Sequence, residues 1–236
     1  MSSEITILSL IVFRTWFLET VRAFITSRPV LIGWSFLVIL SVLIASWDLR
    51  SNNAELGSLM KYVWFLTVVY SGPFGLAVYW YSGRKQISTD SVWRRGFRSV
   101  AHCYSGCGAG EATGLIIAVG LLTINSVPVI AAITFLFAYT FGYALTVGPL
   151  MQEGVPFKEA LVDAFYSETA SIIVMEIVAI TADITLSGGA KITDPLFWTS
   201  LSVSLSLGLL AAYPVNVLLI HFGVKEGMMD PRTAGS

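Results

Sequence analysis

Charged residues are scarce in this chain of 236 residues. Asp, Glu, Lys and Arg make up only 12% of it, about half the share found in soluble domains. The formal net charge of −1 gives no basic surface for nucleic acid. Hydrophobic residues account for 55% of the chain, and the mean hydropathy is +0.75. This composition excludes an ordinary soluble domain and predicts an all-α membrane protein that crosses the lipid bilayer several times.

Cysteine and N-terminal basic residues are also nearly absent. Both cysteines of the chain lie in one short motif, so the sequence predicts no disulfide framework. No basic segment precedes the first apolar residues, so a cleavable signal peptide is not expected. The segment Ile5–Ile25 is apolar but is interrupted by three charged residues. We expect it to form a helix in the membrane interface, with a short spanning helix as the alternative.

Long apolar runs predict about six transmembrane helices, because each run approaches or exceeds the ~20 residues needed to cross a bilayer. The predicted spans are Val30–Trp47, Tyr62–Tyr81, Ala101–Ile124, Val129–Met151, Phe157–Leu186 and Pro195–Phe222. The second span contains Ser71–Pro73, with a glycine between the two, and a kink is expected there.

The charge distribution predicts the orientation. Gly83–Arg98 holds five basic side chains and one acidic one, which is typical of a cytoplasmic loop in the cell membrane. Six spans would then place both termini in the cytoplasm. The predicted organisation is an interfacial helix over 1–29, a two-helix hairpin over 30–82, the basic loop over 83–100, a four-helix domain over 101–223 and a loose polar tail over 224–236.

The segment Ala101–Gly114 carries the residues best suited to bind a metal. Cys103 and Cys107 would lie one helical turn apart, and Glu111 one turn further along the same face. Thiolates are ligands for copper(I) or zinc, and His102 would join them if the helix began at Cys103. The alternative is that both cysteines only pack as small buried side chains.

Three glycines in the same segment predict close helix packing. Gly106, Gly110 and Gly114 recur every four residues and therefore share one face of a helix. Such a ridge of small residues lets a neighbouring helix backbone approach closely within a membrane. We therefore assign these glycines to helix packing.

Acidic residues without basic neighbours in the sequence give the second functional signal. Between Arg98 and Lys158 there is no Lys or Arg, and none follows until Lys191. Carboxylates within a membrane usually face the bundle interior, where each must be protonated, hydrogen-bonded or bound to a cation. The candidates for a cation or proton path are Glu111, Glu168, Met175 and Glu176. Asp163 and Asp183 are expected at solvated helix ends.

Several motifs resemble those of a bacterial and archaeal membrane family known as domain of unknown function 4396. They are H-C-Y-S-G-C-G-A-G-E-A-T-G at 102–114, F-G-Y-A-L-T-V-G-P-L at 141–150, S-E-T-A-S-I-I-V-M-E-I at 167–177, D-P-L-F-W-T-S-L at 194–201 and Y-P-V-N at 213–216. The resemblance covers Ala101–Gly223 and implies a helical membrane domain with a metal-related role. It points to His102, Cys103, Gly106, Cys107, Gly110, Glu168, Ser171, Met175 and Glu176. The chain departs from the family pattern at Glu111 and in a tail without extra histidines.

These signals predict a membrane protein that binds or transports a cation, either copper or zinc, with proton coupling. The alternative is an accessory or assembly subunit that docks on a membrane-protein partner or on a second copy of itself. A membrane enzyme is the weakest hypothesis. Cys103 beside His102 could act as a nucleophile, but no third group that would orient them is evident.

Overall fold

The computed structural model describes residues 2–152 and 154–234, and every regular element in that part of the chain is helical. The elements are α1 (Ser2–Ile25), α2 (Arg28–Ser51), α3 (Ser58–Ser71), α4 (Pro73–Ser82), α5 (Val92–Leu115) with a π-helical continuation (Ile116–Leu121), α6 (Val127–Gln152), α7 (Phe157–Ser187), α8 (Pro195–His221) and a final 3-10 turn (Pro231–Thr233). Within the described residues, four stretches are long and apolar enough to cross a membrane: α2, Val127–Gly148 of α6, α7 and α8. The predicted all-helical class is confirmed, and these helices indicate a membrane protein.

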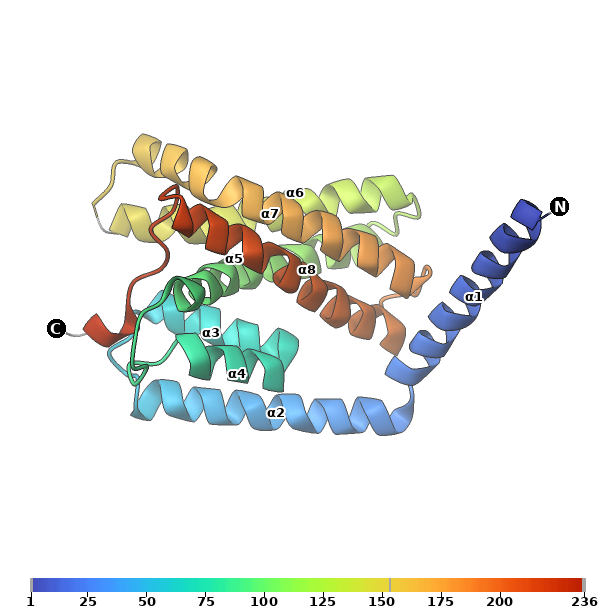
Figure 1. Ribbon diagram of the computed structural model, residues 1–236, viewed down its shortest axis with the longest axis horizontal. Helices are drawn as coiled ribbons and strands as arrows, with labels where there is room; N and C mark the ends of the chain where they lie inside the picture. The colour runs from blue at the N-terminus through green and yellow to red at the C-terminus, as the bar shows by residue number, and fades with distance from the viewer. Residues whose placement is uncertain (1, 153, 235–236) are drawn as a thin grey trace.

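Helix α5 lies at the centre of the bundle (Figure 1) and contacts α3, α4, α6, α7 and α8. It is not among the four apolar helices, because small and polar residues dominate its sequence. Its neighbours bury nearly all of it from Gly96 to Leu115. The apolar helices α6, α7 and α8, together with α3 and α4, therefore enclose a polar helix. Polar residues buried in this way within a membrane protein are usually functional.

The expected single span over Tyr62–Tyr81 is wrong, because the chain reverses direction in its middle. Gly72 has a φ of +55°, which favours glycine, and Pro73 occupies the first turn of α4. Helix α4 then runs back along α3, so that a Cβ added at Gly83 would lie 2.4 Å from the Trp64 ring (Figure 1). With 14 and 10 residues, the two helices are about 21 and 15 Å long, short of the ~30 Å apolar core of a bilayer. They form a helical hairpin.

Asp48 holds both ends of this hairpin close to the C-terminal end of α2. Its buried carboxylate accepts hydrogen bonds from the Tyr79 hydroxyl at 2.8 Å and from Arg84 at 2.8 and 2.9 Å. It also accepts one from the Asn53 amide at 2.9 Å. The chain thus enters and leaves the hairpin at one end of the bundle.

The end of α1 and the C-terminal segment lie at opposite ends of the bundle, whereas six spans would place the two termini together. Arg22 of α1 donates hydrogen bonds to the Thr185 and Leu186 carbonyls at the end of α7, both at 2.9 Å. The C-terminal segment lies at the other end, where Arg98 donates to the Met228 carbonyl at 3.3 Å (Figure 1). The hairpin of α3 and α4 returns the chain to the end from which it started. The five long helices α2, α5, α6, α7 and α8 therefore lead from the α1 end of the bundle to the end that holds the C-terminal segment.

The tail is not loose over the residues described. Gly223, with a φ of +72°, turns the chain back after α8, and the backbone N–H groups of Val224 and Lys225 bond to the Leu219 carbonyl. Lys225 is only 7% exposed. Folding back in this way returns a basic side chain to the interior of the bundle.

Candidate functional site

The residues predicted on α5 lie in the middle of the bundle. His102, Cys103, Cys107 and Glu111 are all buried. The helix begins at Val92, so the condition under which His102 would join the thiols is not met. On a continuous helix His102 points about 100° away from Cys103. It lies near the Leu145 backbone and Lys225, and neither ring nitrogen has a hydrogen-bond partner of normal geometry among the described residues.

The two thiols lie together beside α7. The Cys103 and Cys107 sulfurs are 3.8 Å apart, and the Ser171 hydroxyl lies 3.9 Å from the Cys103 sulfur. The fully buried carboxylate of Glu176 interacts electrostatically with both thiols. Neither of its oxygens has a hydrogen-bond partner of normal geometry within the described part of the chain. The structure therefore brings two thiols and one carboxylate close together.

The glycines predicted for packing lie against the backbone of α6. A Cβ added at Gly106, Gly110 or Gly114 would come within 2.4 to 2.8 Å of a backbone atom. The backbone atoms approached belong, in that order, to Gly142, Phe137 and Thr134. Gly142 also makes room for the thiols, because a Cβ there would lie 2.9 Å from the Cys107 sulfur. Close contact between α5 and α6 thus closes one side of the site.

Glu168 does not lack a basic partner, contrary to our expectation. The Lys225 ammonium lies 2.6 Å from a Glu168 carboxylate oxygen, and the two side chains are 6% and 2% exposed. Sequence reasoning missed Lys225 because it follows the last predicted span. No signal in the sequence connects it to a carboxylate on another helix. A buried carboxylate is costly without such a partner. The ion pair with Lys225 therefore explains how the negative charge of Glu168 is compensated inside the bundle.

A chain of hydrogen bonds connects this ion pair to the thiols. The Asn216 side-chain oxygen accepts hydrogen bonds from Lys225 at 3.2 Å and from the Ser99 hydroxyl at 2.8 Å. The Asn216 amide donates to the Ser171 hydroxyl at 2.6 Å, and that hydroxyl points to Cys103. Ser99 and Asn216 were not predicted. Asn216, a buried polar residue inside the apolar helix α8, could have been singled out by its residue type, whereas Ser99 is one of many small polar residues on α5.

Acidic side chains extend the polar interior towards the other end of the bundle. Glu111 lies within electrostatic range of Glu176 and of Asp183. Asp183 is half-buried and accepts a hydrogen bond from Ser200 at 2.8 Å, so it is not simply a solvated helix end. Asp163, by contrast, is exposed. We call the whole series the polar chain, and it consists of Lys225, Glu168, Asn216, Ser99, Ser171, Cys103, Cys107, Glu176, Glu111, Asp183 and Ser200.

Met175 lies in the same core cluster as the two cysteines. It is fully buried and packs against α8, where a Cβ added at Gly208 would lie 3.0 Å from the Met175 Cγ. The same cluster includes Leu205 and Leu209 of α8. The geometry supports packing for this residue.

The thiol pair meets part of the requirement for a metal ion. Two Zn–S bonds of ~2.3 Å at a tetrahedral angle separate the sulfurs by about 3.8 Å, which is the spacing found here. The same spacing is also an ordinary van der Waals contact between two sulfurs. Over the described residues, no three His, Cys, Asp or Glu side chains converge into a complete metal site. A third ligand would therefore require Glu176 or another neighbour to shift.

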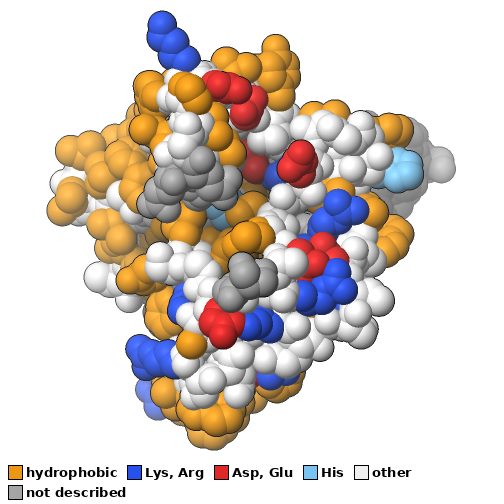
Figure 2. All heavy atoms as spheres, turned by 90° about the vertical axis from the view of Figure 1, so that its left-hand side faces the viewer, with side chains coloured by type: hydrophobic (Ala, Val, Ile, Leu, Met, Phe, Trp, Pro, Cys, Tyr) orange, Lys and Arg blue, Asp and Glu red, His pale blue; other side chains and the backbone are white. Residues whose placement is uncertain are grey.

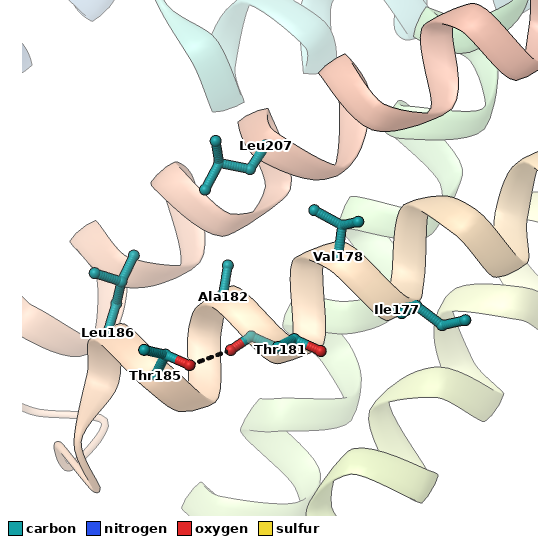
Figure 3. Close-up of a pocket in the computed structure, with 7 residues that line it drawn as sticks. All are labelled: Ile177, Val178, Thr181, Ala182, Thr185, Leu186 and Leu207. Atoms are coloured by element: carbon teal, nitrogen blue, oxygen red, sulfur yellow. Dashed lines mark hydrogen bonds between the residues drawn. The ribbon is translucent and has the colours of Figure 1, made fainter. Parts of the chain in front are cut away.

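A groove lies elsewhere, on the outer surface of α7 and α8 (Figure 3). Its volume is about 460 Å³, and its lining residues are Ile177, Val178, Thr181, Ala182, Thr185, Leu186 and Leu207. The Thr185 hydroxyl is turned to the Thr181 carbonyl of its own helix, at 2.7 Å. This surface has the apolar character that lipid chains require and is separate from the polar chain.

A family model described as "Domain of unknown function (DUF4396)" matches residues 92–225. The match begins with α5 and ends at Lys225, so it includes every member of the polar chain, whereas α1 to α4 lie outside it. No curated protein and no solved structure matches the chain.

Proposed function

Because the chain belongs to the DUF4396 family, whose description assigns no activity, we propose its function from geometry: it transports a cation across a membrane through the interior of α5, α7 and α8. The polar chain is the observation that carries this proposal. It reaches from the ion pair at the C-terminal end to Asp183 and Ser200 near the other end. Polar groups inside a membrane are costly, and they typically mark the path of an ion or proton.

The cargo we propose is a soft cation, copper(I) or zinc. Cys103 and Cys107 are the thiol ligands that such ions prefer, and Glu176 beside them supplies a negative charge. A transport site must bind its ion firmly enough to admit it and weakly enough to release it. Two thiols with an adjustable third ligand suit that requirement. Glu111 and Glu176, for which no ion pair with Lys or Arg is found over the described residues, would carry coupled protons.

The topology we propose has five membrane crossings, formed by α2, α5, α6, α7 and α8. Helices α3 and α4 dip into the membrane from one side, and α1, with exposed Phe13, Trp16 and Phe17, lies along the opposite interface. Figure 2 shows basic side chains gathered at the end of the bundle that holds the C-terminal segment. Short loops rich in Lys and Arg face the cytoplasm, so this end would be cytoplasmic and α1 would be outside.

Site-directed labelling tests the hairpin. A membrane-impermeant maleimide should label Ala54→Cys and Ser88→Cys, both at exposed positions, from the cytoplasmic side only. Lys191→Cys, beyond α7, should be labelled only from the outside. The parent protein controls for its two buried cysteines. Labelling of the first two variants from opposite sides would show that α3 and α4 form one span and would refute the five-crossing topology.

Metal binding tests the cargo. Detergent-purified protein loaded with copper(I) or zinc under reducing conditions should retain about one ion per chain, as measured by mass spectrometry, because two thiolates are available. The Cys103→Ser, Cys107→Ser variant should retain none. Glu176→Gln should bind about ten-fold more weakly or worse, since ligand-adjacent groups are typically worth 10–100-fold in affinity.

The matched control is Glu159→Gln, which removes an exposed carboxylate from the first turn of the same helix. It should bind metal like the parent. In proteoliposomes the parent should move the ion that it binds, and the cysteine variant should not. If the parent binds no metal, or if transport persists without both thiols, the proposed soft-cation route is wrong.

A further inference from the structure

Lys225 is the last member of the polar chain, and it lies outside the helices. Lys225 lies beyond α8, in a segment that turns back at Gly223 and again at Gly227, both with positive φ. Its ammonium is the only partner within hydrogen-bond distance that the described structure provides for the Glu168 carboxylate. A segment outside the helices therefore supplies the positive charge for a carboxylate on α7.

Oxygen atoms of the bundle surround this ammonium. Nζ of Lys225 lies 2.6 Å from Oε1 of Glu168 and 3.2 Å from Oδ1 of Asn216. Oε2 of Glu168 is buried without a hydrogen-bond partner in the described part of the chain, so the site has an unused acceptor. The two oxygens of this carboxylate and the Asn216 amide oxygen form a donor set that hard cations prefer. The single negative charge matches a monovalent ion.

Between Val224 and Asp230 only Lys225 is buried, whereas Pro231 and Ala234, further along the same segment, are buried against the bundle. Arg95 donates to the Glu226 carbonyl at 3.4 Å, and Arg98 donates to the Met228 carbonyl at 3.3 Å. Both are long hydrogen bonds, and Val224 and Met229 on the same segment are exposed. Segments with few buried contacts open at a low free-energy cost compared with the core of a protein.

We propose that Glu168 and Asn216 form a binding site for a monovalent cation, and that Lys225 fills this site as a tethered ammonium. A free cation can enter only when the C-terminal segment leaves, so this segment acts as a plug on the polar chain. The inference goes beyond the soft-cation site and uses none of its atoms. The two proposals can therefore fail separately.

Chemical rescue of Lys225→Ala tests the cation site. The variant removes the tethered ammonium and leaves Glu168 buried without a partner. Its thermal unfolding midpoint is measured in the same detergent with methylammonium chloride, potassium chloride or N-methylglucamine chloride at equal ionic strength. Methylammonium or potassium should raise the midpoint by about 2 to 4 °C over N-methylglucamine, because an ion that binds only the folded state stabilises it. The parent, whose site is already filled, should show no difference.

Two further variants complete the test. Lys158→Ala removes an exposed lysine from the start of α7 and should behave like the parent. The Glu168→Gln, Lys225→Ala variant has no charge at the site and should not respond to the small cations. The proposal is overturned if Lys225→Ala shows the same midpoint in all three salts. It is also overturned if Lys225→Ala cannot be recovered folded in the presence of methylammonium. The proposal requires that methylammonium fill the vacant site and so replace the missing ammonium group.

Discussion

Replacing Glu168 by glutamine is expected to lower the free energy of unfolding by about 3 to 5 kcal/mol, because it leaves the Lys225 ammonium buried beside a neutral amide. Breaking a buried ion pair from one side is costly, since the remaining charge has lost its hydration without compensation. Reversible unfolding in mixed detergent, followed by tryptophan fluorescence, measures the loss.

Asp163→Asn is the matched control for that variant. It neutralises a carboxylate on the same helix that is exposed, and its effect should stay within about 0.5 kcal/mol of the parent. Adding Lys225→Met to Glu168→Gln removes the second charge and should restore most of the stability, because the two effects are coupled through one contact. Equal stability of Glu168→Gln and the parent would mean that Lys225 is not buried against α7.

Replacing Gly110 by alanine is expected to cost about 3 kcal/mol, as overpacking does in other tight interiors. The added Cβ would lie 2.4 Å from the Phe137 carbonyl oxygen and 2.6 Å from the Ala138 Cα. Both are backbone atoms of α6, so no side-chain rotation relieves the clash, and the two helices must separate. The loss is measured by the same unfolding experiment.

Gly33→Ala provides the comparison for this steric effect. Gly33 lies in α2, and nothing lies within 4 Å of a Cβ added there. Alanine should leave the stability unchanged or raise it by a few tenths of a kcal/mol through its higher helix propensity, which exceeds that of glycine by about 1 kcal/mol. If Gly110→Ala were as well tolerated as Gly33→Ala, the backbone contact between α5 and α6 would be wrong.

The sequence errors share one cause: hydropathy measures the length and apolarity of a segment but not its direction. Ser71–Pro73 contains a glycine followed by a proline, and this pair is compatible both with a kink in one helix and with a reversal of the chain between two helices. The choice depends on Gly72 adopting positive φ and on Asp48, which binds Tyr79 and Arg84 at the far end of the hairpin. Those contacts join residues more than thirty positions apart, so a local pattern could not reveal them.

The sequence by itself determined the helical class, the membrane-like composition, the family and the concentration of chemically useful side chains on α5 and α7. These follow from residue type and local spacing, because helix formation and burial in lipid depend mainly on which side chains recur along a segment. Only the tertiary structure decided how α3 and α4 fold back, which ends of the bundle the termini occupy and how Lys225 meets Glu168. An ion pair between a turned-back tail and a helix depends on three-dimensional approach, and residues distant in the chain carry no local signal of the partner they will meet.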